Sequence, residues 1–257
     1  MLNYKNTNLF IALFLVIVLS AHQWMQVSWW WMALLIVVYI LILIYGSVYI
    51  GSDFYMPVVC KVVTEKKQIA LTFDDGPVEK NTSLVLDVLK RNNIPAAFFC
   101  IGKRMDENKS LSKRIEEEGH VIGNHSYSHN FFFDFFSTKR MVDELERTNK
   151  IAEQTIGKKL KLFRPPYGVT TPNLARAVKK NNYSTIGWSV RTMDTVARNK
   201  KELLTKITGN IKPGDVILFH DTVDVTTLAL QSFIDQVKQQ GYELVRLDKL
   251  LNIEAYA

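Results

Sequence analysis

Short apolar runs that favour β-strands alternate with helical patterns along most of this chain, and the alternation limits the folds open to it. The first run, residues 69–73, has the length and the continuous apolar character of a buried strand. Further runs cover residues 96–101, 120–124, 160–163, 185–190, 216–219 and 243–247. Strands that alternate with helices predict parallel pairing, in a barrel or in a large doubly wound sheet.

The segments between these runs carry the apolar period of amphipathic helices. The expected helices cover residues 82–91, 111–118, 138–155, 172–180, 201–208 and 226–239. Ser137 and Thr171 are suitable N-caps, and Pro172 suits the first helical position. The glycines expected to follow helix ends as C-caps are Gly119, Gly157, Gly209 and Gly241.

The unusual polar residues of the chain fall just after the predicted strands. They are Asp74 and Asp75 after the first strand, His125 and His129 after the third, Arg164 after the fourth, Asp194 after the fifth and His220 after the sixth. In α/β folds the carboxyl ends of the strands form one face, and sites are built there. Each residue alone has a simpler reading as a turn, surface or capping residue. Together they predict one site.

The first of these groups places two carboxylates side by side, followed by Gly76 and Pro77. Two ionised Asp side chains in one dry pocket would repel each other, unless their roles are separated. A metal ion separates them, because one carboxylate binds the cation while the other stays free as a general base. The alternative is that Asp74 and Asp75 are turn residues that cap the next helix.

His125 and His129 are four residues apart, beyond another apolar run. On a helical turn this spacing presents two imidazoles to one point, as in many zinc sites. With Asp75 they would form a site of two histidines and one carboxylate, which leaves coordination positions open for water and substrate. The alternative is a pair of unrelated surface histidines.

The N-terminal part of the chain has a different character, with no formal charge between Lys5 and Asp53. Residues 9–25 are almost wholly apolar, and residues 29–50 are uncharged with tryptophans at one end and tyrosines near the other. These features predict a hairpin of two transmembrane helices, with the main domain and the N-terminus on one side of the membrane. A signal peptide cut after Ala21 is the alternative.

The net charge of +7 therefore lies on the rest of the chain, and it indicates an anionic neighbour such as lipid headgroups or an acidic wall polymer. Nucleic acid is not expected, because acids interleave with the basic residues and no binding motif is present. Nor does the sequence indicate an obligate protein partner. Cys60 and Cys100 form no metal-binding pattern. Cys100 is expected in the core, and a disulfide with Cys60 stays open for an extracytoplasmic domain.

Four stretches in order resemble the motifs of the polysaccharide deacetylases of carbohydrate esterase family 4, the NodB homology domain. They are residues 72–76 (TFDDG), 125–129 (HSYSH), 164–167 (RPPY) and 218–220 (LFH). The resemblance spans about residues 69–251. It implies an α/β fold, a distorted (β/α)7-type barrel, and the hydrolysis of N-acetyl or O-acetyl groups on sugars.

The resemblance also implies roles for the first three motifs. Asp74 would be the general base, and Arg164 would orient it by a charge-assisted hydrogen bond. Asp75, His125 and His129 would hold a divalent metal ion, expected to be Zn²⁺ with Co²⁺ or Ni²⁺ as alternatives. The metal would polarise the acetamide carbonyl and lower the pKa of its water.

The remaining roles follow from the third and fifth motifs. The backbone N–H of Tyr167 would help to hold the oxyanion, and Leu218 would line the pocket for the acetyl methyl group. His220 would protonate the leaving amine.

The fourth motif departs from the family pattern of an Asp, two residues and Asp-Trp. Arg191 stands in place of the first Asp and Thr195 in place of the Trp, while Asp194, which would pair with the catalytic histidine, is present. The machinery is therefore expected to be complete, with an altered wall of the sugar groove.

The sequence thus predicts a membrane-anchored, metal-dependent N-deacetylase of a cell-envelope polysaccharide, with peptidoglycan expected as substrate. The expected parts are an anchor (1–50), a connector (51–67) and an extracytoplasmic catalytic domain (68–257). Chitin oligomers or another acetylated glycan are the alternative substrates. The competing functions are a catalytically silent carbohydrate-binding membrane protein and a non-haem iron oxygenase that uses the same ligand set.

Overall fold

The fold is built on one parallel β-sheet, seen in a computed structural model that describes residues 2–26 and 28–257. Within these residues the sheet has eight strands in the order β5-β4-β3-β2-β1-β7-β6, with β8 paired to β1. The strands are β1 (Gln68–Asp74), β2 (Ala97–Cys100), β3 (Val121–Asn124), β4 (Leu162–Phe163), β5 (Ser184–Thr185), β6 (Val190–Arg191), β7 (Val216–His220) and β8 (Glu243–Leu244). The prediction of parallel pairing is confirmed, because every strand pair is parallel.

The predicted single strand over residues 185–190 is wrong. It is two short strands, β5 and β6, which lie on opposite edges of the sheet. Residues 186–189 join the two edges, and so few residues span at most about 18 Å. The sheet must therefore curl until its edges approach each other, which gives the expected distorted barrel.

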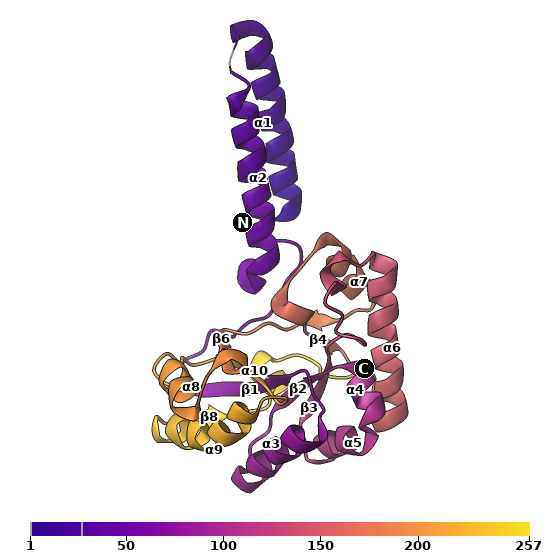
Figure 1. Cartoon of the computed structure of the whole chain (residues 1–257), viewed down its shortest axis with the longest axis vertical. Coiled ribbons are helices and arrows are strands. Elements are labelled where there is room, and N and C mark those ends of the chain that lie inside the picture. Colours follow the sequence, from indigo (N-terminus) through magenta and orange to yellow (C-terminus); the bar gives the residue numbers. More distant parts are fainter. Residues whose placement is uncertain (1, 27) are drawn as a thin grey trace.

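All but the last helix of the domain cover the outside of the curled sheet (Figure 1), and the last packs against its other face. The helices of the domain are α3 (Glu79–Asn92), α4 (Gly102–Glu107), α5 (Lys109–Glu117), α6 (Thr138–Ile156), α7 (Pro172–Lys180), α8 (Lys200–Ile207), α9 (Asp224–Gln239) and α10 (Leu247–Leu251). The six predicted helices are present, and the two short helices α4 and α10 were missed. The last predicted strand, residues 243–247, is shorter than expected. Strand β8 ends at Leu244, and α10 begins at Leu247.

The predicted helix caps are mostly confirmed. The side chains of Ser137 and Thr171 accept hydrogen bonds from the first turns of α6 and α7, and Pro172 opens α7. Gly157 ends α6 with a left-handed φ of 68°. Gly209 is wrong as a C-cap, since it has no positive φ.

Strand alternation divides the core between the two faces of the sheet. Phe73 points outward and stacks on Phe98 and Phe219, with ring centroids 5.1 and 5.9 Å apart, in the cluster that includes the helices. Ala70 belongs to the smaller cluster of the other face, which α10 closes. The period of two places Asp74 on the same inner face as Ala70.

Two apolar helices, α1 (Tyr4–Met25) and α2 (Trp30–Val48), stand out from the domain as a side-by-side pair (Figure 1). The Tyr39 hydroxyl donates to Asn8 Oδ1 across the pair at 2.8 Å. Both helices are long and apolar enough to cross a membrane. The predicted turn between them includes Val27, which lies outside the described residues.

Candidate active site

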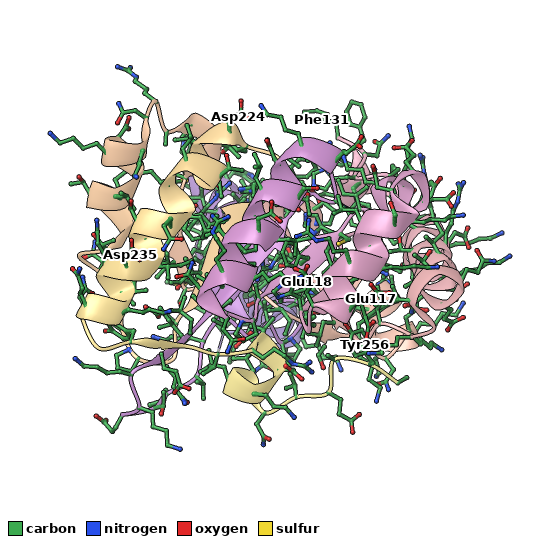
Figure 2. All side chains as sticks on the ribbon, turned by 90° about the horizontal axis from the view of Figure 1, so that it is seen from below. Glu117, Glu118, Phe131, Asp224, Asp235 and Tyr256 are labelled. Atoms are coloured by element: carbon green, nitrogen blue, oxygen red, sulfur yellow. The ribbon has the colours of Figure 1, made fainter. Side chains whose placement is uncertain are left out.

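The predicted site residues meet at the carboxyl ends of β1, β3, β4 and β7, as the α/β pattern requires. In Figure 2, a view from below, Phe131 and Asp224 lie along one edge of the domain. They follow His129 and His220 by a few residues. Glu117 and Glu118 lie near the middle of this view, and Tyr256 lies below them.

Asp75, His125 and His129 form a group that could hold a metal ion. Asp75 Oδ1 lies 3.3 Å from His129 Nε2 and 3.6 Å from His125 Nε2. Ligand atoms about 2 Å from one tetrahedral metal are about 3.3 Å apart, so the three side chains fit such an ion. Asp75 Oδ1 is also buried without a hydrogen-bond partner, which is costly unless a cation or proton meets it.

His125 is held in the form that a metal ligand needs. Its Nδ1 lies 2.8 Å from the backbone carbonyl of Arg164, so Nδ1 carries the proton and Nε2 keeps its lone pair toward Asp75. Burial, together with the smaller effect of the nearby His129, lowers the pKa of His125 to about 3. The imidazole is therefore neutral at pH 7.

The expected helical turn between the two histidines is wrong. Residues 125–130 form an irregular loop, with left-handed φ angles at Ser126 (62°) and His129 (46°). Side chains from neighbouring elements hold this loop in place. The Glu144 carboxylate accepts from the backbone N–H groups of Tyr127 and Ser128 and from the Ser128 hydroxyl. The two imidazoles meet because of this loop geometry.

Asp74 is buried and bound by Arg164, which lies inside the curled sheet with no exposed surface. Arg164 Nη1 donates to Asp74 Oδ1 at 2.7 Å and to the Thr72 hydroxyl at 2.8 Å. Burial raises the pKa of Asp74, and the Arg164 guanidinium opposes that rise. The other donors of Arg164 reach the carbonyls of Gly187 at 2.7 Å and Ile186 at 3.3 Å, in the segment that joins the sheet edges.

Tyr167 lies in a left-handed conformation, with φ of 59°, in the short helix η3 (Pro166–Gly168) after β4. Its ring packs edge-on against His129 at 4.7 Å between centroids. Among the backbone hydrogen bonds of the described residues, none uses its N–H. Such strained positions gather at functional sites, and Asp75, Ser126, His129 and Met193 share the left-handed region here.

His220 and Asp194 are paired, although Asp194 follows β6 and not the strand that was predicted. His220 Nδ1 lies 2.8 Å from Asp194 Oδ1, and the His220 backbone N–H donates to Asp194 Oδ2 at 2.7 Å. Burial alone would lower the pKa of His220, but the hydrogen bond and charge of Asp194 raise it to about 9. Leu218, two residues earlier on β7, is buried.

Several residues that support the site were not predicted to do so from the sequence. Asp221 is fully buried, and its Oδ2 accepts from the Thr82 hydroxyl at 2.6 Å. Arg104 Nη1 donates to the Asp75 carbonyl at 2.7 Å. Thr82 and Arg104 come from helices whose patterns report only their buried faces, and Asp221 lies in the turn after β7. Their contacts with distant residues could therefore not be predicted.

The sequence of residues 61–186 matches a model of the polysaccharide deacetylase family. A peptidoglycan-N-acetylglucosamine deacetylase of Bacillus cereus is 35% identical over 72% of this chain and 68% of its own length. The chain belongs to the polysaccharide deacetylase family. The enzyme PgdA of Listeria monocytogenes, named a peptidoglycan-N-acetylglucosamine deacetylase, is 37% identical over 79% of this chain. The chain spans only 42% of that relative's length.

A solved polysaccharide deacetylase structure shows the same fold. The Bc1960 peptidoglycan N-acetylglucosamine deacetylase superposes with a TM-score of 0.74 at 31% identity, covering 78% of this chain and 95% of that one. The fourth family motif differs in this chain, as the sequence indicated. Arg191 lies exposed on β6, and its guanidinium is 5.7 Å from the centre of the Trp188 ring. The backbone N–H of Thr195 donates to Asp194 Oδ1 at 3.0 Å.

The two cysteines are free thiols, so the disulfide left open by the sequence is not formed. Cys100 is buried as expected, and Cys60 is half-buried. Burial raises the pKa of both thiols.

Proposed function

We propose that this protein is a metal-dependent N-deacetylase of an acetylated glycan. The observation that carries the proposal is the convergence of three functions at one point: a set of metal ligands, a buried carboxylate held by an arginine, and a histidine–aspartate pair. Each function is needed to hydrolyse an acetamide. A bound divalent ion would polarise the acetyl carbonyl and acidify its water.

The chain's own residues supply the proton transfers. Asp74, fixed by Arg164, takes a proton from the attacking water, and the N–H of Tyr167 donates to the oxygen that gains charge. His220, kept protonated by Asp194, gives its proton to the leaving amine. Leu218 lines the space for the acetyl methyl group.

Asp75, His125 and His129 would hold the metal, and we propose Zn²⁺. Nitrogen donors together with one carboxylate suit zinc, and the distances between the ligand atoms match its tetrahedral geometry. Co²⁺ and Ni²⁺ take similar donors and are the alternatives.

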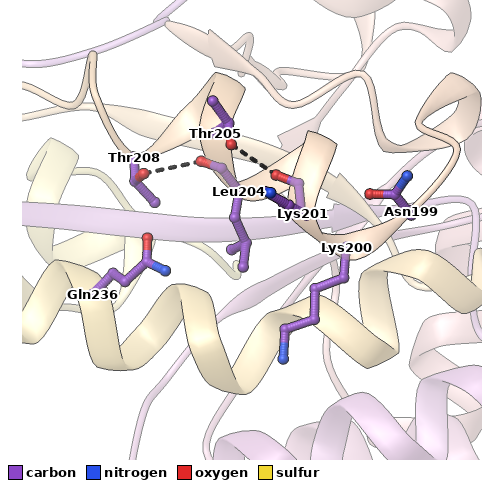
Figure 3. A pocket seen from close by; sticks show the side chains of 7 residues that line it. All are labelled: Asn199, Lys200, Lys201, Leu204, Thr205, Thr208 and Gln236. Atoms are coloured by element: carbon purple, nitrogen blue, oxygen red, sulfur yellow. Dashed lines mark hydrogen bonds between the residues drawn. The ribbon is translucent and has the colours of Figure 1, made fainter.

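The proposed substrate is peptidoglycan. The relatives named above act on it, and the net charge of +7 favours an anionic polymer over neutral chitin. A hollow of about 800 Å³ adjoins Asp194 and is lined in part by Arg198 and Lys200. A second hollow of about 480 Å³, between α8 and α9, shares Lys200 with it and adds Lys201 (Figure 3). Asp194 and Asp224 also line the first hollow, so its charges are mixed, and Lys200 and Lys201 of the second hollow supply the positive charge that supports the same choice.

We further propose that residues 1–50 anchor the protein in a membrane and that residues 68–257 form an extracytoplasmic catalytic domain. Residues 51–67 would connect the anchor to this domain. Two apolar helices, with Lys5 near the start of α1 as their formal charge, and a substrate outside the cell support this arrangement. Reporter fusions in the turn between the helices and at the C-terminus should report opposite sides of the membrane. Reporters on one side would mean that only one helix spans.

Acetate release tests the function. The full chain in detergent should release acetate from peptidoglycan, and a chelator should stop the release until Zn²⁺ is restored. A silent carbohydrate-binding protein would bind the polymer and release no acetate, and an oxygenase would consume O₂ instead. Much faster release from chitin oligomers at low salt would contradict the substrate and leave the deacetylase intact.

A further inference from the structure

The end of the second apolar helix lies directly on the loop that carries Tyr167. The backbone N–H of Thr170 donates to the Ser47 carbonyl at 3.0 Å, and its hydroxyl donates to the Gly46 carbonyl at 3.1 Å. Thr170 is buried there, three residues after Tyr167. The contact joins positions 124 residues apart in the chain.

Gly46 allows this contact because the chain folds back tightly after α2. The Phe54 ring packs on Gly46, and a Cβ atom at Gly46 would lie 2.2 Å from Phe54 Cδ1. Phe54 is buried, and its carbonyl accepts from the Tyr4 N–H of α1 at 2.9 Å. The ends of both apolar helices are thereby fixed to the segment that follows them.

That segment then packs against the residues that hold Arg164. The backbone of Val59 exchanges hydrogen bonds of 2.9 Å with Thr185 and Gly187. A Cβ atom at Gly187 would meet Cys60 Sγ at 2.5 Å and Ile50 Cδ1 at 3.3 Å, so the two segments of the chain are in close contact. The Gly187 carbonyl in turn accepts from Arg164, the partner of Asp74.

We propose that residues 46–60, which we call the seat segment, are a positioning element of the active site and not a flexible tether. Through Thr170 the seat segment holds the loop of Tyr167, and through Val59 it holds the carbonyls that orient Arg164. A left-handed residue such as Tyr167 keeps its strained backbone only when its surroundings fix it. This inference rests on the proposed deacetylase function, since Asp74 and Tyr167 are its base and its oxyanion donor.

Four single variants of the full chain test the proposal. Thr170→Val removes the hydroxyl and keeps the shape, and Thr170→Ser restores the hydroxyl. Gly46→Ala pushes Phe54 away, whereas Gly51→Ala is the matched control, because a Cβ there meets the nearest side chain only at an ordinary 3.5 Å. Since the Ser52 hydroxyl also donates to the Gly46 carbonyl, Thr170→Val leaves that carbonyl partnered.

Kinetics with a soluble N-acetylglucosamine oligomer in detergent supply the first readout. Thr170→Val and Gly46→Ala should lower kcat by about tenfold or more, with KM and bound zinc close to wild type. The expected loss is in kcat because the reacting groups shift while the metal ligands and the glycan contacts stay. Thr170→Ser and Gly51→Ala should match the wild type.

Hydrogen exchange supplies a second readout that does not depend on activity. Backbone amides of residues 165–171 and 185–191 should exchange faster in Thr170→Val and Gly46→Ala than in the wild type. Their exchange rates should be unchanged in the other two variants. Wild-type kcat and exchange in all four variants would overturn the proposal, as would a fall in kcat that only follows loss of zinc. A wild type that releases no acetate from any glycan would defeat the proposed function, while the exchange data would still decide the role of the seat segment.

Discussion

Asp74 and Asp75 are neighbours in the chain, yet their carboxylates have different surroundings. Asp74 continues the alternation of β1 into the inner face of the sheet, where Arg164 binds it. Asp75 has a left-handed φ of 77°, which breaks that alternation and turns its side chain to the two histidines. Left-handed backbone costs roughly 1–2 kcal/mol, and Asp tolerates it better than most residues. This turn lets two adjacent acids do different work.

Metal content should separate the two aspartates. His125→Ala should lose zinc and activity together, because one of three protein ligands is removed. Asp74→Asn should keep zinc and lose most turnover, because a base and not a ligand is removed. Zinc per chain and acetate release, measured on the same samples, check this. An Asp74→Asn protein without zinc would mean that the two aspartates have the opposite roles.

As the proposed acid and its partner, His220 and Asp194 should set the alkaline limit of the reaction. With a pKa of about 9, His220 stays protonated below that pH and can act as the acid, so kcat/KM should fall only above it. In Asp194→Asn the pKa of His220 loses its main raising influence and should drop toward or below its ordinary value of 6.5. The alkaline limb should then move down by about two pH units or more. Zinc content and circular dichroism serve as controls, and an unmoved limb would exclude His220 as the acid.

At the scale of elements, helix α6 shapes the metal site without contributing a ligand. Glu144 holds the loop between the two histidines by accepting from three donors, two backbone N–H groups and one hydroxyl, and the carbonyl of Leu145 next to it accepts from Asn124 at the end of β3. The helix therefore fixes where the histidine loop leaves the sheet. Groups that hold metal ligands in place commonly affect metal affinity by about 10–100-fold.

Glu144→Ala should weaken zinc binding by about tenfold or more, because the loop of His125 and His129 loses its acceptor. Glu146→Ala is the matched control, since Glu146 is exposed on the same helix. Zinc titration against a competing chelator measures both. Equal affinities for the two variants would show that the loop is fixed by other contacts.

On the scale of the whole molecule, the net charge and the proposed membrane anchor should act together. The hairpin carries almost no charge, so the basic surface belongs to the domain that stands on it. An anchored enzyme meets a nearby polymer at a high effective concentration, and its positive charge attracts an anionic one. Both effects favour a wall glycan over a diffusible neutral sugar.

Salt should therefore weaken action on peptidoglycan more than action on a neutral chitin oligomer. Screening shortens the range of the attraction between the basic domain and the polymer, and it leaves the chemistry at the metal site untouched. The ratio of kcat/KM values for the two substrates, followed from low to physiological salt, measures the effect. A ratio that does not change would remove charge from the argument for substrate choice.

The sequence by itself determined most of the order of strands and helices, apart from the split run 185–190 and the short helices α4 and α10, and it predicted the candidate site residues. Asp75, His125 and His129 were predicted as one ligand set because strand ends must meet at one edge of a parallel sheet. The family could be predicted from four short motifs, because each motif is a local stretch of sequence. Local patterns report which residues are buried and where elements begin and end. This information was enough to predict the face of the fold on which the candidate site lies.

Only the tertiary structure decided how the site is held. The run 185–190 was predicted as one strand, and it became two strands because its halves pair with β4 and β7 on opposite edges of the sheet. The histidine spacing predicted a helical turn, but contacts with Glu144 favour a left-handed loop instead. Residues 46–50 of the seat segment were predicted as the end of the membrane anchor and residues 51–60 as part of the connector, yet Gly46 meets Thr170 far along the chain. Hydrogen bonds between distant residues leave no period in the sequence, so their consequences appear only when the chain is folded.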